Sequence, residues 1–151
     1  MSNVVPIPKP EPAAVFDWVA PDDVPAQWDL VLPAIAEVAV HGDHWRPEDV
    51  YMALRQGASH LHVIQLDGRY AGCIVTTPTR AHDGMTLHVW IGFSTPDVNL
   101  HAATMAQLHD WARNLKARRI VFTSPRRGWE RLARKLGFTP TLTTYECEVQ
   151  P

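Results

Sequence analysis

The dipeptide Asp67-Gly68 lies between two runs of residues that favour β-strands. Residues 60–66 precede it and residues 69–77 follow it, and both runs are rich in apolar residues. Asp-Gly between two such runs is the strongest short-range signal of a β-hairpin, because both residues tolerate the positive φ of a tight turn. The sequence therefore predicts an antiparallel pair of strands over residues 60–77.

Segments with helical periodicity and strand character alternate around this hairpin. In residues 24–40 the apolar positions recur every three or four residues, which is typical of a helix that ends before Gly42. Pro47 suits the first position of a second helix, which Gly57 ends. The other predicted elements are a strand over 85–93, a long helix that begins at Asp97 or Asn99, a strand over 120–123, a helix over 128–136 and a strand over 139–149.

The predicted order of elements is therefore ααβββαβαβ. Such an order packs as one twisted mixed sheet with helices on both faces, which places the chain in the α/β (α+β) class. A chain of 151 residues suits one domain, which we expect over residues 15–151. Single residues separate four prolines from Pro6 to Pro12, and this pattern predicts an extended, polyproline-like arm over residues 1–14.

Composition indicates a protein of the cytoplasm. No apolar run approaches the roughly 20 residues of a membrane span, and the first residues lack the organisation of a signal peptide. The two cysteines, Cys73 and Cys147, are too few for a disulfide scaffold. Each lies in a strand-like run and is expected to be an inert thiol.

Charge is distributed unevenly along the chain, although the net charge is only −2. Residues 1–50 hold nine acidic side chains against two basic ones, whereas residues 113–135 hold nine basic side chains against Glu130 alone. A basic block of this kind meets nucleic acid, a phosphorylated cofactor or an acidic protein surface, or it is only a solvated helix face. Trp111 and Trp129 lie on the apolar helix faces instead of between exposed bases, which makes nucleic acid the third choice.

The segment WERLARKLGF, from Trp129 to Phe138, resembles the last helix of the GNAT acyltransferases and the Gly-Phe pair that follows it. With Gly42–Trp45 and Asp67-Gly68, it is also similar to small phage-encoded proteins of this kind. The resemblance covers about residues 24–149 and implies the GNAT fold. It also implies an enzyme that moves an acetyl group from acetyl-CoA, or another acyl-CoA, to an amine.

Two features depart from the family pattern. The family binds the CoA pyrophosphate on a glycine-rich turn before the long helix, where the main chain must approach the phosphates closely. Here the corresponding residues 94–101 contain no glycine, and they include Pro96, which lacks an N–H, and the acidic Asp97. The family's usual tyrosine acid is replaced by Ala133.

The resemblance nevertheless assigns a cofactor site. It implies that acyl-CoA lies against the third predicted strand and the start of the long helix. The basic residues around the last helix would hold the phosphates through guanidinium groups. The residues assigned to the cofactor in this way are Ile91, Phe93, Asn99, Leu100, His101, Arg126, Arg127, Arg131 and Arg134.

Three residues are candidates for catalysis. His88 is the titratable side chain of the third predicted strand, where the family commonly has a general base, and it is equally suited to be a packed strand residue. Ser124 would hydrogen-bond the pantetheine arm or a water molecule, or it only turns the chain before Pro125. Tyr145 would replace the missing acid, or it packs at the rim of the core.

No metal site is predicted. His41, Asp43 and His44 lie close in sequence, and His60 and His62 share a strand face. Zinc needs three or four converging ligands, and neither a Cys-x-x-Cys nor a His-Glu-x-x-His spacing occurs.

Two functions of different classes stay open. The first is an active acyltransferase that binds acetyl-CoA in an atypical way. The second is a catalytically degenerate protein that keeps the fold and modulates a host protein in the host cytoplasm. The charge asymmetry suits such docking, because it steers association. Nucleic-acid contact through residues 113–135 is a third alternative, and the sequence predicts no oligomeric state.

Overall fold

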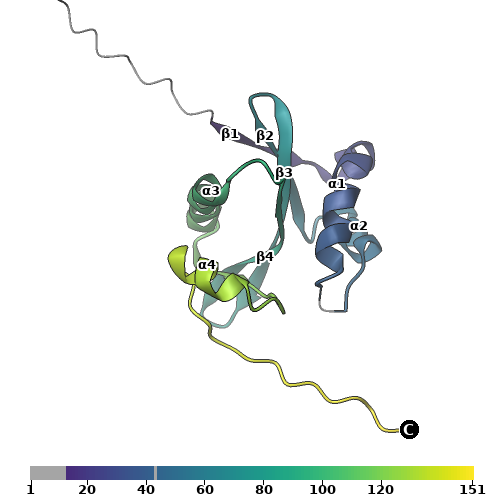
Figure 1. The fold of residues 1–151 in the computed structure, drawn as a ribbon, viewed down its shortest axis with the longest axis vertical. Helices are drawn as coiled ribbons and strands as arrows, with labels where there is room; N and C mark the ends of the chain where they lie inside the picture. Colours follow the sequence, from purple (N-terminus) through teal and green to yellow (C-terminus); the bar gives the residue numbers. More distant parts are fainter. Residues whose placement is uncertain (1–12, 43) are drawn as a thin grey trace, which may run out of the picture.

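The computed structural model describes residues 13–42 and 44–151, which form a five-stranded sheet with helices on both faces (Figure 1). The strands follow the order β1-β2-β3-β4-β5. Their bounds are β1 Ala14–Val19, β2 His60–Leu66, β3 Arg69–Ala81, β4 Gly84–Ser94 and β5 Ala117–Phe122. The helices are the 3-10 turn η1 Pro21–Asp23, α1 Val24–Ala39, α2 Pro47–Arg55, α3 His101–Asn114 and α4 Trp129–Lys135.

The predicted hairpin is confirmed. β2 and β3 pair antiparallel, and both Asp67 and Gly68 have positive φ, at 52° and 72°. β3 pairs antiparallel with β4, and β4 pairs with β5 in parallel. The long connection through α3 permits that parallel pairing, since parallel strands need a crossover. The sheet is therefore mixed, as the sequence predicts.

The first strand is not predicted from the sequence. β1 begins at Ala14, the last residue of the predicted proline-rich arm, and it pairs antiparallel with β2 over all six of its residues. Phe16 and Val19 point towards the core, and Val15 and Trp18 stay exposed on this edge strand. Residues 1–12 of the arm lie outside the described part of the chain, so the arm itself stays a prediction.

The predicted last strand is wrong for this structure. Residues 139–149 belong to no helix or strand, and their side chains are exposed. Alternation of residue types becomes a strand only where a neighbouring strand accepts its backbone hydrogen bonds, and within residues 13–42 and 44–151 this segment has no such neighbour. Apart from β1 and this segment, the predicted order of helices and strands is confirmed.

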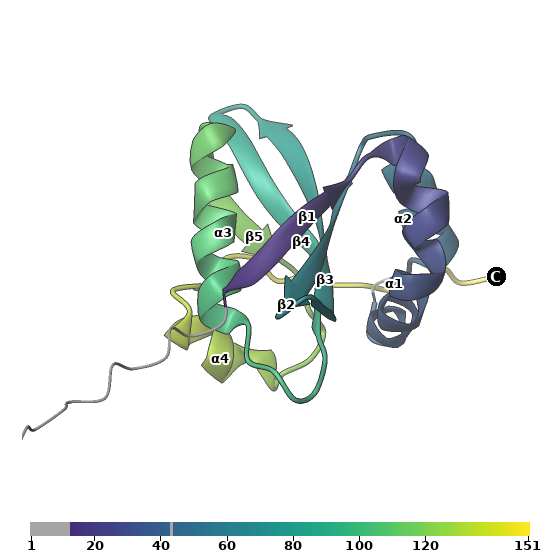
Figure 2. The ribbon, with the colours of Figure 1, turned by 90° about the horizontal axis from the view of Figure 1, so that it is seen from above.

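The helices lie on both sides of the sheet (Figure 2), and two apolar clusters hold them there. On one face, α1 and α2 bury Val31, Ile35 and Leu54 against β2 and β3. On the other face, Leu108 and Ala112 of α3 pack on residues of β3 and β4. None of the described helices is both long and apolar enough to cross a membrane.

His62 makes the α3 face sensitive to pH. Its ring packs against Trp111 with 4.0 Å between the ring centroids. Its buried Nδ1 has no hydrogen-bond partner among the described residues. Burial, and to a smaller extent the neighbouring His60, lowers the pKa of His62 from 6.5 to about 4. The folded protein therefore holds this imidazole neutral at a pH where the unfolded chain protonates it.

The free energy of unfolding is expected to fall as the pH drops from 6.5 towards 4, because the unfolded state binds the extra proton in this range. Denaturant titrations across this range measure the effect. The variant His62→Phe keeps a ring beside Trp111 but cannot titrate, so its stability is expected to depend less on pH. The change of exposed His109 to Phe is the control. An equal pH dependence in His62→Phe and the native chain would contradict the assignment.

Candidate active site

The site begins where β4 and β5 separate. Their parallel pairing ends at Val89 and Phe122, and β4 then continues to Ser94 paired with β3 but not with β5. The chain after Phe122 turns away towards α4. The stretch of β4 beyond Val89 therefore presents a strand edge towards a gap inside the sheet.

A β-bulge lies at the same place in β4. Val75 pairs with Ile91 and Thr76 pairs with Val89, so Trp90 has no partner in the register. A bulge inserts one residue and reverses the alternation of side chains between the two faces. Leu87 and Val89 accordingly pack with α3, whereas Ile91 packs in the cluster under α1 and α2.

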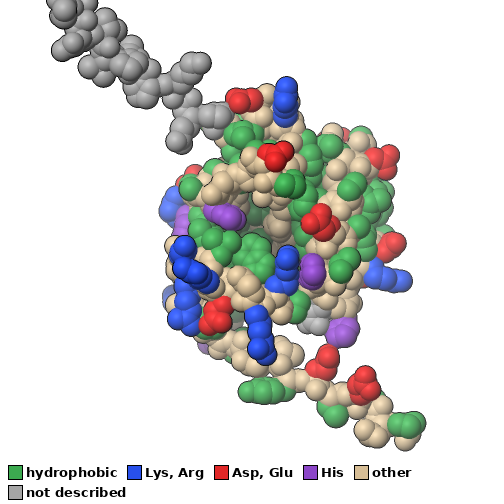
Figure 3. Space-filling model, in the orientation of Figure 1, with side chains coloured by type: hydrophobic (Ala, Val, Ile, Leu, Met, Phe, Trp, Pro, Cys, Tyr) green, Lys and Arg blue, Asp and Glu red, His purple; other side chains and the backbone are tan. Residues whose placement is uncertain are grey.

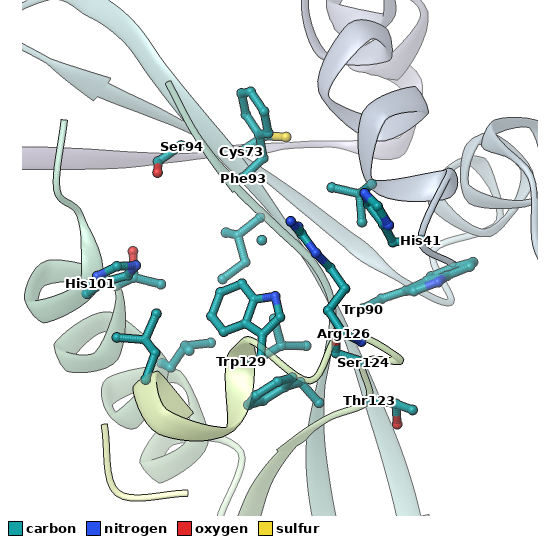
Figure 4. Close-up of a pocket in the computed structure, with 18 of the residues that line it drawn as sticks. His41, Cys73, Trp90, Phe93, Ser94, His101, Thr123, Ser124, Arg126 and Trp129 are labelled. Carbon is teal, nitrogen blue, oxygen red and sulfur yellow. The ribbon is translucent and has the colours of Figure 1, made fainter. Parts of the chain in front are cut away.

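A cavity of about 680 Å³ occupies the gap. Side chains from the end of α1, from β4, from α3 and from α4 line it, so it extends from one face of the sheet to the other (Figure 4). Figure 3 shows the hollow in this face of the molecule, with hydrophobic side chains inside it and basic and histidine side chains near its rim. The volume is in the range of small-molecule and cofactor sites.

His88, one of the predicted catalytic residues, lies at the cavity. It lies on β4 between Leu87 and Val89, is half-buried and lines the cavity. Burial lowers the pKa of His88 below its ordinary value of 6.5. The imidazole is therefore neutral at pH 7 and able to accept a proton.

Ser124 and Arg126 enter the cavity from the turn between β5 and α4. The backbone N–H of Arg126 donates a hydrogen bond to Ser124 Oγ, with 3.2 Å between the atoms. This bond sets the turn, as is usual for a serine before proline. Figure 4 shows the Arg126 side chain extending into the cavity between Trp129 and His41.

The start of α3 forms another wall. Asn99 Oδ1 accepts the backbone N–H of His101 at 3.1 Å, and Leu100 is buried beneath the turn. The His101 side chain lines the cavity, as does that of Phe93 on β4. The helix therefore directs its amino end, where the macrodipole is positive, towards the cavity side of the sheet.

Several residues assigned by the sequence lie elsewhere. Tyr145 is 91% exposed in the C-terminal segment and does not line the cavity. Ile91 is buried under α1 and α2, because the bulge turns it to that face. The cavity lining also omits three of the four arginines that were assigned to the phosphates, and one of them, Arg134, donates a hydrogen bond to Glu130 at 3.0 Å. The three are Arg127, Arg131 and Arg134.

The residues at the end of α1 are not predicted as site residues from the sequence. Glu37, His41 and Trp45 line the cavity from this side, and the Trp45 ring lies edge-on to Trp90 with 5.5 Å between the centroids. Trp129 is predicted to lie on the apolar face of its helix, and its indole also lines the cavity. Two aromatic residues outside the periodic helical positions, Trp45 and Trp90, are the sequence signal of this part of the site. They are far apart in the sequence, so no motif indicates that they are neighbours.

Cys73 lies in the cavity wall, where it is fully buried. Burial raises the pKa of its thiol to about 11, so the sulfur stays protonated and is not a nucleophile at pH 7. Among residues 13–42 and 44–151, no group of three potential metal ligands gathers, and Asp43 lies outside the described residues.

Comparisons with known proteins identify the fold. No family model and no curated protein matches the chain. Among solved structures, it is similar to a ribosomal-protein-alanine N-acetyltransferase from Brucella melitensis biovar Abortus 2308, with a TM-score of 0.69 and 14% identity over 91% of this chain and 100% of the other.

Two further solved structures contain the cofactor. An aminoglycoside N-acetyltransferase, AAC(6')-Iy, in complex with CoA has a TM-score of 0.66 and 14% identity over 96% of this chain and 99% of the other. A predicted acetyltransferase with acetyl-CoA from Clostridium acetobutylicum has a TM-score of 0.65 and 8% identity over 89% of this chain and 96% of the other. The chain therefore has the fold of the GNAT acetyltransferases, as the resemblance predicts.

Proposed function

We propose that the protein is an acyltransferase that moves an acetyl group from acetyl-CoA to an amine of a small molecule or a protein. The observation that carries the proposal is the strand edge of β4 beyond Val89, which faces a cavity in the middle of the sheet. An extended ligand with amide groups can pair with such an edge as an added strand would. The pantetheine arm of CoA is a ligand of this kind.

The charged end of the cofactor needs donors, and we assign this role to two of the side chains that line the cavity. The Arg126 guanidinium extends into the cavity, and the His101 imidazole lies at the start of α3. Guanidinium groups bind phosphate through paired, charge-assisted hydrogen bonds. We assign the phosphates to this pair because the turn before α3 has no glycine and Pro96 has no N–H to donate.

His88 is the proposed general base. The amine nitrogen attacks the thioester carbonyl, a C–N bond forms, and the C–S bond breaks. His88 takes the proton that the acceptor's ammonium group loses before its nitrogen attacks, and the second proton, lost as the amide forms, passes to the CoA thiolate that leaves. Tyr145 is not assigned as the acid, because it is exposed and away from the cavity.

The amine is proposed to enter from the end of α1. Glu37 and His41 lie at this end of the cavity, and Trp45 and Trp90 form an aromatic corner beside them. A carboxylate attracts an ammonium group, and aromatic faces bind cations. An acceptor with an aliphatic amine suits these groups.

Calorimetric titration with acetyl-CoA at low salt tests cofactor binding. We expect saturable binding by the native chain and an affinity lower by about tenfold or more in Arg126→Ala, since a charge-assisted hydrogen bond contributes about 1.5–3 kcal/mol. Arg131→Ala is the matched control, because Arg131 is another arginine of the basic block over residues 113–135 but does not line the cavity. Equal affinities in both variants would exclude Arg126 from the phosphate site.

The same titration distinguishes the acyltransferase from the second candidate function, a protein that keeps the fold but does not bind CoA. Pro96 and Asp97, in a turn without glycine, favour a protein that keeps the fold and binds a partner without CoA. A folded native chain that takes up no acetyl-CoA would support this candidate and contradict the acyltransferase. A phage origin, a host protein as partner and a cytoplasmic location stay predictions of the resemblance and the composition.

A further inference from the structure

We propose that the preferred acyl donor is a small acidic carrier protein, which presents the acyl group on a phosphopantetheine arm, and that arginines beside the cavity dock this protein. The inference rests on the proposed acyltransferase function and names the partner of the same site. The acceptor nitrogen forms a C–N bond to the acyl carbon, and the C–S bond to the arm breaks. Of the two protons that the ammonium group loses, one passes to His88 and one to the leaving thiolate, so the carrier departs with a free thiol. Acetyl-CoA remains a weaker donor.

The turn before α3 is poor in donors for a diphosphate. Pro96 has no N–H, and the backbone N–H groups of Thr95 and Val98 already donate to carbonyl oxygens of the chain, at 2.8 and 3.3 Å. The N–H of His101 donates to the side chain of Asn99. Four positions of the turn therefore offer no N–H to a ligand, whereas a diphosphate at a helix start is bound by several such groups.

The cavity lining suits an arm with one phosphate group. Among the described residues, Arg126 is the only Lys or Arg side chain of this lining, and Asp97 is exposed on the turn before α3. CoA carries a diphosphate and a further phosphate on its ribose, whereas the arm of a carrier protein ends in a single phosphodiester. One guanidinium group matches a phosphodiester through paired hydrogen bonds, and the Asp97 carboxylate repels the more highly charged nucleotide. These charges favour the arm without the nucleotide.

Helix α4 presents one side to the cavity and a basic side to solvent. Trp129 and Leu132 line the cavity, whereas Arg131 and Arg134 are exposed and do not line it. Residues 126–135 hold five basic side chains against one acidic side chain. Figure 3 shows basic side chains beside the hollow. This surface suits an acidic protein, because charges of opposite sign steer association and fix the orientation of the partners.

The position of Arg126 places the carrier on this surface. The arm joins its protein at the phosphate, so the protein surface lies next to the group that binds the phosphate. Arg126 lies in the turn that leads into α4, and the exposed Arg127 follows it. Carboxylates of the carrier would therefore pair with Arg127 and Arg131. Nucleic acid, another polyanion, has no arm that enters the cavity.

Calorimetric titration with two forms of one carrier tests the arm. The probe is an acidic acyl carrier protein, with and without its phosphopantetheine arm, at low salt. The form with the arm is expected to bind the native chain more tightly by about tenfold or more, since the arm adds charge-assisted hydrogen bonds in the cavity. Arg126→Ala is expected to reduce this difference. With one amine acceptor, kcat/KM for the acetylated carrier is expected to exceed that for acetyl-CoA by about tenfold or more.

Arg127→Ala with Arg131→Ala tests the docking surface. Affinity for the carrier is expected to fall by about tenfold, because two ion pairs are lost. Affinity for acetyl-CoA is expected to stay within about twofold, because neither side chain lines the cavity. The matched control is Arg80→Ala with Arg118→Ala, which removes exposed arginines of β3 and β5 at the end of the sheet away from the cavity. The control is expected to change neither affinity.

Two results would overturn this inference and leave the acyltransferase intact. In the first, acetyl-CoA binds and donates its acetyl group, but the carrier binds no better with its arm than without it. In the second, the Arg127 and Arg131 double variant keeps the native affinity for the carrier. Duplex DNA that binds in place of the carrier, and less to this variant, would likewise show that the basic surface meets nucleic acid. A folded chain that binds neither donor and transfers no acetyl group would instead contradict the proposed function itself.

Discussion

Replacement of His88 by alanine is expected to lower kcat for acetyl transfer by about 10²- to 10⁴-fold, the usual contribution of a general base. Acetyl-CoA affinity is expected to stay within about twofold of the native value, because the proposed phosphate contacts come from Arg126 and His101. The measurement is thiol release from acetyl-CoA with a panel of aliphatic amines, combined with calorimetric titration. The matched control is His109→Ala, which removes an exposed histidine of α3.

The pH profile distinguishes a base from a packing residue. Burial lowers the pKa of His88 below 6.5, so the acid limb of kcat/KM of the native chain is expected to have its midpoint below pH 6.5. The residual activity of His88→Ala is expected to lack this acid limb. A variant that keeps full turnover, or that keeps the acid limb, would show that His88 only packs in the strand.

The parts of the fold that the sequence predicts correctly are those that depend on residues close together in the chain. The Asp67-Gly68 turn needs positive φ at both residues, and few residue pairs allow it, so the turn identifies β2 and β3. The helical stripe of α1 and the Pro47 start of α2 are signals of the same kind. Each of these features is decided by residues a few positions apart.

The two errors at the ends of the chain concern pairing between distant residues. β1 pairs with β2, which lies more than 40 residues later in the sequence, and a run such as AVFDWV is too short to show this. Residues 139–149 alternate well but have no paired strand in the described chain. A strand forms only where a second segment pairs with it, so the sequence of one segment alone does not predict the strand.

The residues of the candidate site were likewise predicted only in part. His88, Ser124 and Arg126 were found because the resemblance fixes their elements, and the structure places all three at the cavity. Ile91 was misplaced because a bulge at Trp90 shifts the alternation by one residue, and no residue type announces a bulge. Phe93 packs against the same apolar cluster as Ile91, but unlike Ile91 it lines the cavity.

Gly72→Ala is expected to destabilise the fold by about 3 kcal/mol or more, which is the upper range for overpacking. Gly72 lies on β3 opposite Ser94, and a Cβ there would stand 2.1 Å from the carbonyl oxygen of Phe93. That oxygen belongs to the backbone of β4, so it cannot rotate away as a side chain would. The β3–β4 pairing that positions the open edge of β4 would have to shift, and denaturant unfolding measures the loss.

Gly92→Ala is the matched control on the facing strand. A Cβ at Gly92 meets no atom within 4 Å, and its φ is not in the left-handed region. The change is therefore expected to leave stability unaltered or to raise it by up to about 1 kcal/mol, since alanine reduces the freedom of the unfolded chain. Gly92 also lines the cavity, so the added methyl group is expected to weaken acetyl-CoA binding without unfolding the protein. Equal losses of stability in the two variants would contradict the predicted clash. They would mean that replacing any strand glycine destabilises the protein, independently of the close approach of β3 to β4 at Gly72.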